Sequence, residues 1–114
     1  MTVSREKAAE LKDAGWKEKT AFAYDTGTGL LVYKREARGP AGDWLPAPDL
    51  SELGKVVSED DLSHYWTEKV KKPRTAVSLV GGMLENAVQY GKWLYKVLTD
   101  PNLLADVWLW KERS

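Results

Sequence analysis

Few residues in this chain have the types and spacing that chemistry requires, and His64 is the first of them. It is the only histidine, which excludes a metal site built from several histidines. A base acting alone also needs a nucleophile and an orienting partner, and the sequence identifies neither. Asp60 and Asp61 precede His64 by four and three residues, on the same face of a helix. A partly exposed histidine beside helix-capping carboxylates is the favoured interpretation.

The acidic run Glu59-Asp60-Asp61 could supply oxygen ligands to a divalent cation, but it lacks the alternating spacing of a calcium loop. Consecutive carboxylates at a helix start commonly compensate the helix dipole. Gly27-Thr28-Gly29 lacks the third glycine of a dinucleotide-binding fingerprint. The chain contains no cysteine, which excludes thiolate chemistry and disulfides. We therefore expect no catalytic residue, metal or cofactor, and predict that the protein is not an enzyme.

One basic run follows two aromatic residues. These rings and cations are Tyr65, Trp66, Lys69, Lys71, Lys72 and Arg74. Cations beside stacking rings are typical of a groove for single-stranded nucleic acid, but lysines that protect a solvated strand edge explain the same residues. Basic and acidic residues number 17 each, so no global field attracts a polyanion. Nucleic-acid binding is therefore the alternative hypothesis, and we regard nucleic acid as an unlikely partner.

Aromatic residues bear more directly on function, because the chain has six tryptophans and five tyrosines. Exposed rings of these two types are the usual hot spots of protein interfaces. The candidate contact residues, for a host or phage protein or for self-association, are Tyr90, Trp93, Trp108 and Trp110. Whether residues 103–110 form a helix or a strand stays open. On a helix Trp108 and Trp110 point about 200° apart, so both cannot enter one core, whereas on a strand they share a face.

The elements that position these residues begin with a helix over 5–14, between the capping Ser4 and Gly15. Strands are predicted over 19–25 and 30–36, joined by a turn with two glycines. Trp44-Leu45 forms a third extended segment.

Two capping boxes follow, each with its second member three residues after the first. Asp49 and Glu52 begin a short helix that Gly54 interrupts, and Ser58 with Asp61 begins another over 60–65. A fourth strand is predicted from Tyr65 to Val70, because this segment mixes β-branched and aromatic residues.

A long amphipathic helix is predicted between Thr75 and Leu98, where apolar residues recur in steps of three and four. These are Ala76, Val80, Met83, Ala87, Tyr90, Leu94 and Val97. Asp100-Pro101 then opens a last segment. With 114 residues the chain suffices for one core. We predict a single α+β domain over residues 1–114, with a small antiparallel sheet flanked by the short N-terminal helix and covered by the long C-terminal helix.

The order of these parts resembles a group of small, uncharacterised phage and prophage proteins that carry an "(A)PTLSEL" segment between a hairpin and a C-terminal helix. The resemblance covers roughly the first seventy residues and the helix near 83–98. Its motifs are Glu10-Leu11-Lys12-Asp13-Ala14-Gly15, the hairpin with Tyr24 and Leu31-Val32-Tyr33, the segment from Pro46 to Gly54, and Tyr65-Trp66.

The resemblance implies a phage-encoded accessory protein of unknown biochemical activity, located in the host cytoplasm. Small accessory phage proteins commonly occupy another protein's surface, so the main hypothesis is a non-enzymatic protein-binding factor, with an inhibitor of a host enzyme or defence complex as its specific form. No uncharged apolar run approaches the roughly twenty residues of a membrane span, and we expect no membrane partner.

Overall fold

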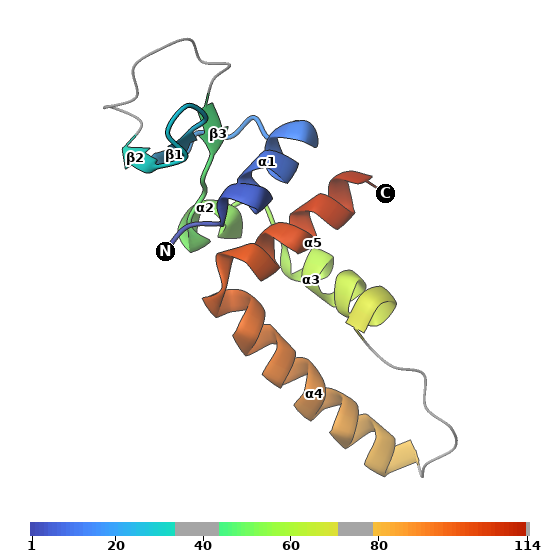
Figure 1. Cartoon of the computed structure of the whole chain (residues 1–114). Coiled ribbons are helices and arrows are strands. Elements are labelled where there is room, and N and C mark those ends of the chain that lie inside the picture. Colours follow the sequence, from blue (N-terminus) through green and yellow to red (C-terminus); the bar gives the residue numbers. More distant parts are fainter. Residues whose placement is uncertain (34–43, 71–78, 114) are drawn as a thin grey trace.

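The computed structural model describes residues 1–33, 44–70 and 79–113, and for residues 79–86 the backbone alone. A three-stranded sheet lies at one end of the molecule, and helices extend from it (Figure 1). In chain order the elements are α1 (Arg5–Asp13), β1 (Phe22–Asp25), β2 (Leu31–Tyr33), β3 (Trp44–Pro46), α2 (Leu50–Gly54), α3 (Glu59–Tyr65), the π-helical turn η2 (Trp66–Val70), α4 (Leu79–Thr99) and α5 (Pro101–Arg113). The predicted α+β class is confirmed.

α1 begins and ends where the sequence predicts. The Ser4 hydroxyl accepts a hydrogen bond from the Lys7 backbone N–H at 3.3 Å, which caps the first turn. At the other end Gly15 has φ +93°, its N–H donates to the Lys12 carbonyl, and the Trp16 N–H donates to the Leu11 carbonyl. This pair of bonds is a Schellman ending. The helix buries Ala8 and Leu11 completely.

The sheet has the order β2-β1-β3, with both neighbours antiparallel to β1. Ala23 lies at its centre, paired with Val32 on one side and Pro46 on the other. In the hairpin turn the Gly29 N–H donates to the Asp25 carbonyl at 2.7 Å, and Gly29 has φ +73°. The predicted hairpin and third extended segment are confirmed, although β1 begins at Phe22 and not at residue 19. Residues 34–36 of the predicted second strand lie outside the described residues.

Both predicted capping boxes are present. Asp49 and Glu52 exchange side-chain to backbone bonds at the start of α2, and Ser58 and Asp61 do so at the start of α3. Glu52 also accepts from the Ala21 N–H at 2.9 Å, which ties α2 to the segment before β1.

The strand predicted over Tyr65–Val70 is wrong, because the chain stays helical through η2. The Thr67 hydroxyl donates to the Ser63 carbonyl one turn earlier, and the Trp66 ring is buried against the Tyr90 ring of α4. Tertiary packing of Trp66 thus overrides the β preference of the segment.

α5 is the central helix, since α1, α2, α3 and α4 all pack against it. Its buried residues are Pro101, Leu104, Ala105, Val107, Trp108 and Leu109. Residues 103–110, for which the sequence left helix and strand open, are therefore helical.

We expected the long helix to cover the sheet. Instead α4 packs mainly on α5 and projects away from the sheet (Figure 1), while α1 packs on β3. Trp93 and Tyr90 of α4 meet the ring of Tyr65 in α3 and the ring of Trp66 in η2, at a distance from the sheet.

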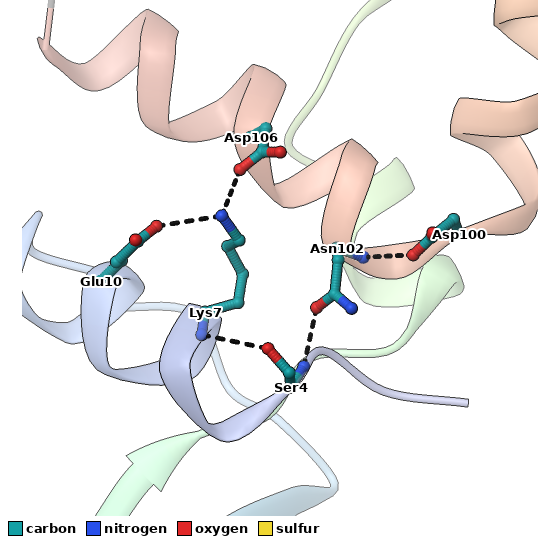
Figure 2. A network of polar contacts seen from close by, with 6 residues as sticks. All are labelled: Ser4, Lys7, Glu10, Asp100, Asn102 and Asp106. Atoms are coloured by element: carbon teal, nitrogen blue, oxygen red, sulfur yellow. Dashed lines mark hydrogen bonds and ion pairs between the residues drawn. The ribbon is translucent and has the colours of Figure 1, made fainter.

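The N-terminal segment is held between the sheet, the β3–α2 connection and α5. Val3 is fully buried, its N–H donates to the Pro48 carbonyl, and its own carbonyl accepts from the Tyr24 hydroxyl at 2.7 Å. The Ser4 N–H donates to Asn102 Oδ1 at 2.7 Å (Figure 2). The two ends of the described chain are therefore packed into one core.

Candidate functional site

Five rings form an aromatic cluster where α3, η2, α4 and α5 meet: Tyr65, Trp66, Tyr90, Trp93 and Trp110. Tyr65 contacts two of the other rings. Its ring stacks on Trp93 with centroids 5.9 Å apart and planes 16° apart, and it meets Trp110 edge to face at 5.6 Å. Such pairs add stability beyond the area they bury. The aromatic cluster therefore joins four helical segments.

The remaining contacts of the cluster hold α4. Tyr90 meets Trp66 edge to face at 5.2 Å and Trp93 at 6.0 Å. Three of the four predicted contact residues, Tyr90, Trp93 and Trp110, thus lie half-buried between helices. The contacts of these rings attach α4 to the rest of the molecule.

The fourth predicted contact residue, Trp108, lies in the core with 7% of its surface exposed. Its ring meets Trp16 edge to face at 5.0 Å. Trp110, two residues later, faces the other side of α5 and joins the aromatic cluster. The predicted angular separation of Trp108 and Trp110 on a helix accounts for this division. A partner does not reach Trp108 without disturbing the core.

The residues predicted for the alternative function, nucleic-acid binding, differ in their exposure to solvent. Trp66 is 8% exposed, so its faces are covered and not open to a base. Tyr65 is half-buried against Trp93 and Trp110, whereas Lys69 is exposed. Lys71, Lys72 and Arg74 lie outside the described residues.

The carboxylates near His64 act as caps in the structure. Asp61 completes the capping box with Ser58, and its Oδ2 lies 3.2 Å from Lys111 Nζ of α5. Partial burial would raise the pKa of Asp61, but the Ser58 N–H and the Lys111 ammonium outweigh it and lower that pKa. His64 is exposed on α3. Within the described ranges, no three histidine or acidic side chains are grouped so that they could hold a metal ion.

A polar groove with a volume of about 490 Å³ runs along one face of α5. It is lined by Glu10, Tyr65, Lys69, Asp106, Leu109, Trp110 and Arg113. The lining combines two carboxylates with two cations, so the groove presents no uniform charge to a polyanion. Burial and the charge of Asp106 raise the pKa of Tyr65, which keeps its hydroxyl protonated in this groove.

Large apolar side chains are exposed on the sector of α4 that points away from its packed residues Trp93 and Val97. Val88, Tyr95 and Leu98 are 54%, 73% and 50% exposed. With Gly91 they occupy positions 88, 91, 95 and 98, and at 100° per residue these lie within about 80° of one another. We call these four residues the outer stripe. Steps of three and four are typical of a helix that packs against another helix.

The sequence did not predict the outer stripe, because the predicted apolar face of this helix was the adjacent series from Ala76 to Val97. In that series Val97 is buried and Tyr90 and Leu94 are half-buried, as predicted, whereas Ala87 is exposed. Ala76 lies outside the described residues, and Val80 and Met83 are described by their backbone alone. The signal for the outer stripe was available as the apolar residues left over once this inner series had been assigned to the core.

Comparison with known proteins found no matching family model, no similar curated protein and no similar solved structure. In the described parts of the chain, no helix is both long enough and apolar enough to span a membrane. The arrangement of residues in this fold is therefore the basis of the functional assignment.

Proposed function

We propose that this chain is a non-enzymatic accessory factor that acts by binding another protein, and that the outer stripe of α4 is its contact surface. The observation that carries the proposal is the exposure of Val88, Tyr95 and Leu98 on one sector of a helix. Tyrosine is one of the residue types that supply most of the binding energy at the centre of an interface, and Tyr95 is the most exposed of the three.

The position of α4 supports the same proposal. The helix is attached along its inner side by Tyr90, Trp93 and Val97, and it projects from the rest of the molecule (Figure 1). A partner helix can therefore reach the outer stripe while the inner side remains packed. Helix-on-helix contacts through residues spaced by three and four are a common mode of recognition.

The identity of the partner protein is a separate question within this proposal. The resemblance of roughly the first seventy residues to phage and prophage proteins directs the search to bacterial host proteins, with a host enzyme or defence complex as the specific hypothesis. The cytoplasm of the host is then the place of action.

Affinity capture from a bacterial lysate, with the partner identified by mass spectrometry, tests the proposal. The wild-type protein is compared with a Tyr95→Ser, Leu98→Ser variant, after circular dichroism shows that the variant is folded. A matched control changes Leu30→Ser and Leu31→Ser, two exposed apolar residues immediately before and at the first position of the edge strand β2. A partner lost only by the α4 variant supports the proposal, and equal recovery by all three proteins contradicts it.

A further inference from the structure

We draw no further inference here: the strongest candidate, the outer stripe of exposed apolar residues on α4, belongs to the surface already described, and nothing in the structure shows what covers it.

Discussion

Lys7 of α1 forms an ion pair with Asp106 of α5, and its ammonium group also lies 3.0 Å from Glu10 of its own helix (Figure 2). This contact joins residues 99 positions apart in the sequence. Burial alone would lower the pKa of Lys7, but the hydrogen bonds to Asp106 and Glu10 outweigh it and raise that pKa. The charged form of Lys7 is thus favoured in the folded protein.

Lys7→Met is expected to lower the free energy of unfolding by about 1 kcal/mol at neutral pH, since both partners keep some access to solvent. The raised pKa means that this contribution is present below the unfolded lysine pKa of about 10.4 and disappears as the pH rises through the folded value. Chemical unfolding at neutral and strongly alkaline pH should show the difference from wild type closing. Lys17→Met, in the exposed segment after α1, is the control. A difference that does not depend on pH would count against this account.

Trp93→Ala is expected to cost about 2–3 kcal/mol of stability, because it removes the ring that stacks on Tyr65 and contacts Tyr90. Tyr95→Ala, on the outer side of the same helix, should cost less than about 0.5 kcal/mol. Urea unfolding measures both values, and amide hydrogen exchange should show faster opening of α4 in the first variant alone. Similar costs for the two substitutions would contradict the assignment of inner and outer sides.

Asp61→Asn is expected to reduce stability by about 1 kcal/mol at neutral pH, through the weakened capping box and the loss of the Lys111 ion pair. The pKa of Asp61 is lowered, so its contribution is present above the unfolded value of about 3.9 and is lost as the pH falls through the folded value. Thermal unfolding between neutral pH and about pH 2 should therefore show the variant and wild type converging. Asp60→Asn, at the exposed preceding position, is the control and should show a smaller effect.

Trp108→Ala is expected to cost about 3–5 kcal/mol, because this ring fills the core beside Trp16. Trp110→Ala should cost less, since its ring is half-buried at the edge of the groove. Circular dichroism with urea titration ranks the two. A reversed order would show that α5 does not present Trp108 to the core. Binding experiments that replace Trp108 therefore report on folding before they report on contact.

Gly91→Ala is expected to stabilise the protein by about 0.5–1 kcal/mol, because Gly91 lies inside α4 and a methyl group there meets nothing within 4 Å. Gly15→Ala should destabilise it by about 1 kcal/mol, since φ +93° at the end of α1 is strained for alanine. Thermal unfolding of the two variants should shift in opposite directions.

Local signals predicted the beginnings and ends of elements well. Ser4, the Asp49 and Glu52 pair, and the Ser58 and Asp61 pair all cap helices as expected. Their hydrogen bonds join residues three positions apart, so the chemistry is complete within a short stretch of chain. The same holds for Gly15, whose positive φ closes α1.

In the segment Trp66–Val70 the local sequence did not predict the secondary structure correctly. Its composition favours a strand, yet Trp66 is buried against Tyr90 of α4 and the chain remains helical. The competing contact comes from a distant part of the sequence, and the energy of burying a tryptophan exceeds the differences in β propensity.

By itself the sequence determined the caps, the hairpin, the α+β class and the opposed directions of Trp108 and Trp110 on a helix, because all of these follow from local bonding and from the helical period. Only the tertiary structure decided that α5 is central, that α4 packs on it and not over the sheet, and which rings are internal. The packing of these helices and rings depends on contacts between apolar surfaces from distant parts of the sequence. The same competition for burial leaves Val88, Tyr95 and Leu98 exposed.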